Sequence, residues 1–272
     1  MFRSVALSAP APAAGVVNLA DAADANFATH ATWALRTLAG ATVLDTPELV
    51  VADSGRPCDT FNLICRARLT DRRAESRVAS AVRRFRQAGR PFSWWSGPAD
   101  QPGNLAVLLA GAGLVHAETE LTMSAELGEV GANAPSAGRL EIRRAGTASQ
   151  LADFARVISE PGGGEIVRFY ADAAGALLAT DSPQRFYVGY LDGEPVASVE
   201  LTLTGRTAGV YGVATRERFR QRGYGTTMTR HALLEARAAG CQTAILQATA
   251  AGAGIYAKLG FSPYGEVREF KP

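Results

Sequence analysis

One stretch of the sequence combines glycines and arginines at a spacing that suits a phosphate group. It runs from residue 213 to 227 and contains Arg220, Arg222, Gly223 and Gly225. An apolar run precedes it and a helical pattern follows, which predicts a strand, a loop and a helix. Glycines let a ligand approach the N–H groups that the first helical turn leaves unpaired. Together with the helix dipole and the arginines, these groups predict a pyrophosphate site.

The same residues have a simpler interpretation as a strand-to-helix turn, with glycines for geometry and arginines for solubility. A P-loop or Rossmann nucleotide site is disfavoured. The segment Gly223-Tyr224-Gly225 lacks the Lys-Ser/Thr pair of the former and the third glycine of the latter.

Two motifs in sequence order carry a family resemblance. Arg-x-x-Gly-x-Gly (Arg220, Gly223, Gly225) follows the run Gly-Val-Ala-Thr at 212–215, and Ile-Tyr-Ala-Lys-Leu-Gly-Phe stands at 255–261. This arrangement resembles the GNAT superfamily of acyl-CoA-dependent N-acyltransferases. The resemblance covers about residues 139–272 and is much weaker over the first half.

The resemblance implies where a coenzyme binds. Backbone groups of Val213 and Thr215 would pair with the pantetheine amides, between two strands that diverge, and residues 221–226 would hold the pyrophosphate. The predicted coenzyme-binding residues are Val213, Ala214, Thr215, Arg220, Gln221, Arg222, Gly223, Tyr224, Gly225 and Thr226. The expected co-substrate is acetyl-CoA, and no metal is expected.

Acyl transfer to an amine needs a proton donor for the departing thiolate. Tyr256 matches the tyrosine of the family's Tyr-x-x-Leu-Gly-Phe segment, and a phenol of reference pKa about 10 is a suitable donor to a thiolate. The resemblance therefore implies that Tyr256 is the catalytic acid. The alternative is a half-buried tyrosine that anchors a core.

The base is less clear from the sequence. Many family members carry a carboxylate on the strand before the anion loop, but residues 208–213 contain none. Glu200, on the preceding strand, is the candidate to accept a proton directly or through water. The alternatives are a solvated surface glutamate, or proton loss to solvent without a base. Tyr211 is a candidate for lining the acceptor pocket.

Alternating and helical patterns in both halves predict an α/β protein with mixed sheets. By the resemblance, the chain consists of two GNAT-like domains, each a twisted mixed β-sheet flanked by helices. The boundaries are a degenerate copy at 1–127, a small-residue linker at 128–138 and the catalytic domain at 139–272. Residues 71–75 of the first copy contain no glycine, so their side chains would obstruct a pyrophosphate and no coenzyme is expected there.

Composition excludes several classes. The 272 residues carry a formal net charge of +2, too balanced to imply a nucleic-acid or membrane partner. The cysteines Cys58, Cys65 and Cys241 lack C-x-x-C spacing, and the three histidines do not suggest a zinc site. We expect reduced thiols in a cytoplasmic protein, without a signal peptide or a membrane span.

The sequence thus predicts a GNAT-type N-acetyltransferase that transfers the acetyl group of acetyl-CoA to a primary amine of a small molecule. Two alternatives stay open at this point. One is acetylation of a protein or peptide amine, and the other is a non-catalytic acyl-CoA-binding regulatory module. The sequence identifies neither the acceptor nor the oligomeric state, and a homodimer is left open.

Overall fold

The computed structural model describes residues 18–128, 139–159 and 163–272. The linker predicted at 128–138 falls, apart from Gly128, outside the described residues.

The first half begins with a helix and alternates short strands with helices. Its elements are α1 (Leu19–Thr32), η1 (Ala34–Arg36), β1 (Thr42–Asp45), β2 (Val50–Asp53), η2 (Asp59–Phe61), β3 (Leu63–Cys65), α2 (Asp71–Gln87), β4 (Ser93–Ser96), α3 (Leu105–Gly111) and β5 (Val115–Glu126). The strand pair predicted around residues 49–65 is confirmed, since β2 and β3 pair antiparallel. The short strand β1 gives too weak an apolar signal to be predicted.

The second half follows the predicted pattern closely. Its elements are β6 (Glu141–Arg144), α4 (Ala148–Ile158), α5 (Gly164–Asp172), α6 (Ala174–Leu177), β7 (Gln184–Leu191), β8 (Glu194–Thr204), β9 (Thr207–Thr215), η3 (Glu217–Phe219), α7 (Tyr224–Ala238), β10 (Thr243–Ala248), α8 (Ala253–Ala257) and β11 (Ser262–Lys271). Thr147 caps α4 by accepting from Gln150 N, as predicted. Asp192 and Gly193 both have positive φ, which suits the tight β7–β8 hairpin.

Within the described residues, eleven strands form one continuous sheet in the order β1-β2-β3-β4-β11-β5-β10-β9-β8-β7-β6. The two halves exchange strands at its centre. The last strand, β11, pairs with β4 of the first half, and β5 of the first half pairs with β10 of the second. Neither half completes its own sheet, so a side chain on β5 can reach the middle of the second half.

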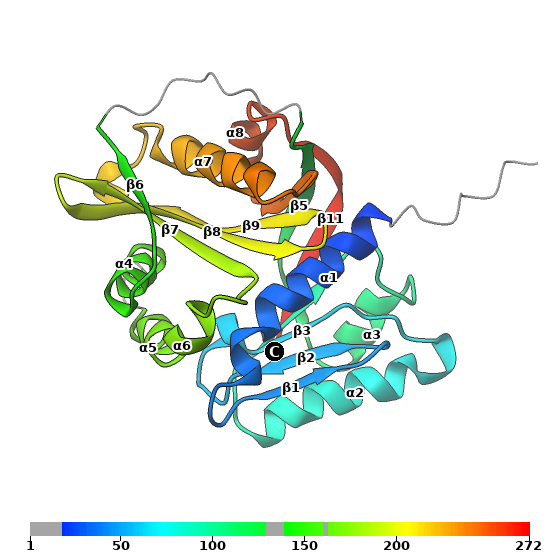
Figure 1. Cartoon of the computed structure of the whole chain (residues 1–272). Coiled ribbons are helices and arrows are strands. Elements are labelled where there is room, and N and C mark those ends of the chain that lie inside the picture. The colour runs from blue at the N-terminus through cyan, green and yellow to red at the C-terminus, as the bar shows by residue number, and fades with distance from the viewer. Residues whose placement is uncertain (1–17, 129–138, 160–162) are drawn as a thin grey trace, which may run out of the picture.

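Helices cover both faces of the twisted sheet (Figure 1). In the second half, α7 packs on one face of β7, β8 and β9, and α4 packs on the other. The predicted buried side of α7 is confirmed, because Met228, Ala232, Leu233 and Ala236 are fully buried. Helix α1 lies in the angle between the halves and contacts β8 and β9 as well as β2 and β3. It therefore joins the two halves on the face opposite α7.

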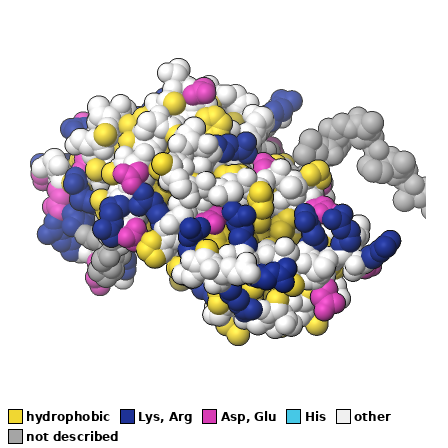
Figure 2. All heavy atoms as spheres, turned by 90° about the horizontal axis from the view of Figure 1, so that it is seen from below, with side chains coloured by type: hydrophobic (Ala, Val, Ile, Leu, Met, Phe, Trp, Pro, Cys, Tyr) yellow, Lys and Arg dark blue, Asp and Glu magenta, His cyan; other side chains and the backbone are white. Residues whose placement is uncertain are grey.

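The face seen in Figure 2 carries basic and acidic side chains side by side, with apolar side chains between them. Basic groups do not gather there into one stripe of the kind that tracks a phosphate backbone.

Candidate active site

Strands β9 and β10 pair at their beginnings and then separate. Their parallel register runs from Thr207 opposite Thr243 to Gly209 opposite Ile245. Beyond Gly209, β9 stays paired with β8 as far as Thr215, with a register shift near Gly212. The described part of β10 offers no partner to that far end of β9. An opening therefore lies between the two strands, with backbone groups of residues 210–215 along one side.

The loop at the end of this opening has the geometry that the glycines predict. Gly223 is the N-cap of α7, with φ 79° and ψ 3°, and no side chain in the described chain caps it. Gln221 also has a positive φ, of 62°. The first N–H groups of α7 have no acceptor within the helix, and the positive end of the dipole lies at the same place. This junction is suited to an anion.

A cleft of about 510 Å³ joins the loop to the opening. It is lined by every predicted coenzyme-binding residue except Arg222, together with Ile158, Phe219 and Tyr256. Arg222 instead donates from Nη2 to the carbonyl of Arg218 and lies over the ring of Phe219. Arg220 donates from Nε to the carbonyl of Thr215 at 3.1 Å, so it fixes the loop against the end of β9.

Tyr256 lies on α8 where two clefts meet. It lines the 510 Å³ cleft and also a second cleft of about 340 Å³, which is the opening between β9 and β10. Its ring packs edge-on against Phe261. Burial raises the pKa of Tyr256 above its ordinary value, and the nearby Glu120 adds to the shift. The phenol is thus protonated at neutral pH, as a proton donor must be.

Glu120 is a residue that the sequence analysis missed. It lies on β5 and lines the 340 Å³ cleft with Tyr256, Gln247 and Gly212. Burial, and then Glu118 and Glu269, raise the pKa of Glu120 to about 7, which suits a group that exchanges protons near neutral pH. It reaches this cleft only because β5 pairs with β10.

Glu200 is buried rather than a solvated surface glutamate, with 1% of its area exposed. Its Oε1 accepts from Gln184 Nε2 at 2.8 Å and lies 2.9 Å from Nδ1 of His30, on α1. It lines a third cavity, on the α1 face of the sheet, rather than the cleft of Tyr256. Gly212 lines both that cavity and the 340 Å³ cleft, so the two adjoin at a residue without a side chain.

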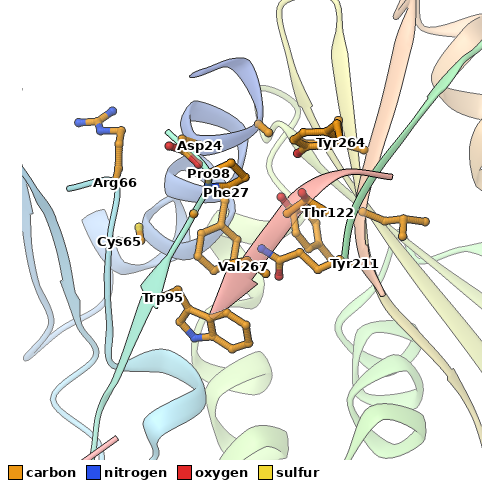
Figure 3. A pocket seen from close by; sticks show the side chains of 15 residues that line it. Asp24, Phe27, Cys65, Arg66, Trp95, Pro98, Thr122, Tyr211, Tyr264 and Val267 are labelled. Atoms are coloured by element: carbon orange, nitrogen blue, oxygen red, sulfur yellow. The ribbon is translucent and has the colours of Figure 1, made fainter. Parts of the chain in front are cut away.

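Tyr211 does not stand free at this junction. Its hydroxyl donates to Asn26 Oδ1 at 2.9 Å, and its ring stacks on His30 at 3.9 Å. Figure 3 shows Tyr211, Phe27 and Trp95 turned toward one another from both halves. The space left among these and their neighbours is about 30 Å³. This layer is packed core that supports the opening, and the space left in it is too small for an organic ligand.

Comparison with known proteins identifies the second half. The model of the acetyltransferase (GNAT) family matches residues 144–261. This part of the chain is a GNAT domain. No curated protein sequence matches the chain.

Solved structures extend the likeness in fold to the first half. A GCN5-related N-acetyltransferase from Kribbella flavida covers 91% of this chain and 95% of its own at 18% identity, with a TM-score of 0.67. A tandem GNAT protein from the clavulanic acid biosynthesis pathway covers 82% of this chain and 78% of its own at 14% identity and TM-score 0.59. A GCN5-related N-acetyltransferase from Sphaerobacter thermophilus covers 84% and 82% at 12% identity and TM-score 0.59. The chain thus has a GNAT-like fold in both halves. The match of residues 144–261 to the acetyltransferase family indicates an acyl-CoA-dependent acyltransferase.

The first half has the same strand-to-helix junction as the GNAT domain, but its backbone groups are occupied. After β3 and β4 separate, Gln101 N donates to the carbonyl of Ala67 at 2.9 Å, and Leu69 N donates to the carbonyl of Gln101 at 3.1 Å. Ala67 N donates to Asp100 Oδ1 at 2.8 Å. A loop of the chain therefore fills the place where the GNAT domain has its opening.

Two negative findings concern the described residues alone. They contain no group of three His, Cys, Asp or Glu side chains placed to bind a metal ion. Their helices are all too short or too polar to cross a bilayer.

Proposed function

We propose that the protein transfers the acetyl group of acetyl-CoA to the primary amine of a small molecule. The observation that carries this proposal is the pair of diverging strands that leads from the uncapped N-terminus of α7 to Tyr256. An elongated ligand with an anionic end and a reactive tip fits that arrangement.

In the proposed complex, the N–H groups of residues 221–226 hold the pyrophosphate and the backbone of Val213 pairs with the pantetheine arm. Thr215 contributes less than its position alone indicates, because its carbonyl already accepts from Arg220. Arg220 therefore contributes in two ways: its hydrogen bond holds the loop against the end of β9, and its charge attracts the pyrophosphate. The domain division at 1–127 and 139–272 is part of the proposal, with the coenzyme bound in the second part.

The reaction forms a bond between the amine nitrogen and the thioester carbonyl carbon and breaks the bond between that carbon and sulfur. Tyr256 gives its proton to the departing thiolate. Glu200, which lies next to Gly212 and His30, takes the proton that the amine loses, directly or through water. Glu120 is the competing proton acceptor, because it lines the cleft of Tyr256.

The two alternatives differ in what they require of the site. A protein or peptide acceptor needs an open groove, whereas the cavity beside Glu200 is small and enclosed by residues of both halves. A purely regulatory acyl-CoA module has no need of a half-buried tyrosine at the meeting point of two clefts. Both observations favour the small-molecule enzyme.

The test is release of free thiol from acetyl-CoA in the presence of a panel of amines, with a thermal melt of the same samples. We expect acetyl-CoA to raise the melting temperature and at least one amine to release thiol at a catalytic rate. Stabilisation by acetyl-CoA without turnover of any amine would favour the regulatory module. Absence of both would refute the proposed function.

A further inference from the structure

A cavity of about 180 Å³ lies between the two halves, beside the coenzyme cleft. On the side of the first half it is enclosed by α1, the η2 turn and β3. On the side of the second half it is enclosed by helices α4, α5 and α6 and by strands β7, β8 and β9. Its apolar walls consist of Ala31, Ala34, Phe61, Leu63, Ile158, Phe169 and Leu177. The volume is below the ~300–1,000 Å³ of pockets for drug-sized ligands, so an occupant is small.

The polar lining is formed by His30, Thr60, Tyr170, Gln184 and Glu200. Gln184 has its Nε2 directed at two acceptors, Glu200 Oε1 at 2.8 Å and the carbonyl of His30 at 3.4 Å. These contacts fix the orientation of the amide. They leave Gln184 Oε1 buried without a hydrogen-bond partner.

A buried acceptor without a donor is unfavourable, and here it stands beside a buried carboxyl group. Glu200 Oε1 receives the hydrogen bonds from Gln184 and Thr202 and lies 2.9 Å from Nδ1 of His30. The Gln184 oxygen still lacks a donor, and the buried carboxyl group beside it favours a donor that carries positive charge. Among the described residues, the lining contains neither Lys nor Arg, and His30 is directed at Glu200, so a second group of negative charge on the same ligand has no partner there.

We propose that this cavity binds the acetyl acceptor, and that the acceptor is a small amine with a single positive charge, an apolar body and no carboxylate. This inference rests on the proposed function. The ammonium group lies at Glu200 and Gln184, and the apolar body lies against Phe61, Phe169 and Leu177.

The cavity shares one lining residue with each of the two clefts on the coenzyme side. Gly212 lines it and the opening between β9 and β10, and Ile158 lines it and the cleft of the anion loop. A Cβ atom at Gly212 would lie 2.9 Å from Phe154 and 3.7 Å from Cβ of Glu200, so a side chain at this position would collide with the Phe154 ring beside the cavity. Gly212 therefore adds only backbone to the boundary between the cavity and the opening.

The proposal also gives the first half a role. His30, Thr60, Phe61 and Leu63 all belong to it and form one side of the cavity. Without these residues the amine would face solvent, so the half with the filled junction completes the acceptor pocket of the other half.

The substrate test compares two amines that differ by one group. We expect kcat/KM for 2-phenylethylamine to exceed that for phenylalanine by about 10- to 100-fold or more, because only the latter buries an unpaired carboxylate. Hexylamine against 6-aminohexanoate repeats the comparison without an aromatic ring. Equal rates, or faster reaction of the carboxylated member of each pair, would overturn the proposal.

The site test uses matched variants. Gln184→Met is expected to raise the KM for 2-phenylethylamine about tenfold and to leave the KM for acetyl-CoA unchanged. Ala34→Leu fills the cavity and should raise the same KM, whereas Ala28→Leu, equally buried on α1 but outside the lining, should not. Unchanged amine KM in both cavity variants would overturn the assignment.

Thermal stabilisation by acetyl-CoA is measured for every variant. A cooperative melt shows that each variant is folded. The shift with acetyl-CoA distinguishes a wrong acceptor class from a wrong proposed function. If acetyl-CoA stabilises the protein but no singly charged apolar amine reacts, the acceptor class is wrong. If acetyl-CoA does not stabilise the protein, the proposed function itself is refuted, whatever the acceptor.

Discussion

The two strand-to-helix junctions of this protein differ in what their backbone groups contact. In the second half, β9 separates from β10, Gly223 starts the helix in a left-handed conformation, and a cleft of about 510 Å³ follows. In the first half, Thr70 starts α2, and Gln101 pairs with Ala67 and Leu69. The same fold thus gives an open cleft or a closed core. The difference depends on whether another part of the chain satisfies the peptide groups.

The largest expected effect comes from closing the open junction. Gly223→Val places a β-branched residue at φ 79°, where L-residues are strained and a side chain hinders approach to the first turn of α7. We expect loss of stabilisation by acetyl-CoA and a fall in kcat/KM of about 100-fold or more.

Gly240→Ala is the matched control, since Gly240 follows the other end of α7 with φ 88° and open space around its Cα. It should lower stability by about 1–2 kcal/mol and leave acetyl-CoA binding intact. Normal acetyl-CoA binding by Gly223→Val would show that the anion site does not lie at the N-terminus of α7.

The next effect concerns chemistry at the open junction. Tyr256→Phe removes the proposed proton donor but keeps the ring packed on Phe261. We expect kcat to fall about 100-fold while the Kd for acetyl-CoA, measured by titration calorimetry, stays the same. Tyr264→Phe, which alters a tyrosine outside both clefts, should leave kcat unchanged. Equal kcat in wild type and the Tyr256 variant would exclude this residue from the mechanism.

A third change opens the filled junction. Asp100 accepts from the backbone of Ala67 and Gly97 and pairs with Arg68, so Asp100→Ala leaves buried donors unpaired. Denaturant unfolding should show a loss of about 2–3 kcal/mol, with no change in the KM for acetyl-CoA. A folded variant that no longer binds acetyl-CoA would show that the first half takes part in coenzyme binding.

The smallest effect is a pH dependence of stability. The pKa of Glu120 is about 7 in the folded protein, above its ordinary value, so the native state favours the protonated form. Stability from this group is therefore full below about pH 4.5 and falls as the pH rises to about 7. Glu120→Gln should be more stable than wild type at pH 8 by about 1 kcal/mol, or about 2–4 °C in Tm, and equal to it at pH 4.

Glu126→Gln, on the exposed end of the same strand, should show no such crossover in thermal melts. The same pair of variants decides the role of Glu120 in catalysis. If Glu120 accepts the proton of the amine, the limb of the kcat/KM profile near pH 7 disappears in Glu120→Gln; an unchanged profile would leave Glu200 as the base.

The sequence predicts the second half well because its signals are local. Apolar runs in the sequence coincide with strands β9 and β10, and the Arg-x-x-Gly-x-Gly motif marks the loop before α7. The predicted coenzyme residues, except Arg222, share one cleft for that reason. The assignment of Tyr256 and Glu200 to catalysis stays a prediction. Tyr256 lines the opening, whereas Glu200 lines the cavity that adjoins the opening at Gly212.

Residues that meet through tertiary structure were beyond the reach of those signals. Glu120 enters the cleft only because β5 crosses to β10, and His30 reaches Glu200 only because α1 lies between the halves. Neither pairing leaves a periodic pattern or a fixed spacing in the chain. Gln184 likewise looks like the first residue of an ordinary strand until its amide is seen beside Glu200.

The exchange of β5 and β11 has a consequence for how the protein is made. During synthesis β4 is made long before its partner strand β11, because Ser96 pairs with Arg268. An early chain therefore presents an unpaired edge, which is a site for aggregation. Cutting the gene between its halves would leave β4 unpaired in the first product and the β5-facing edge of β10 unpaired in the second, so the halves should be recovered soluble only when they are produced together.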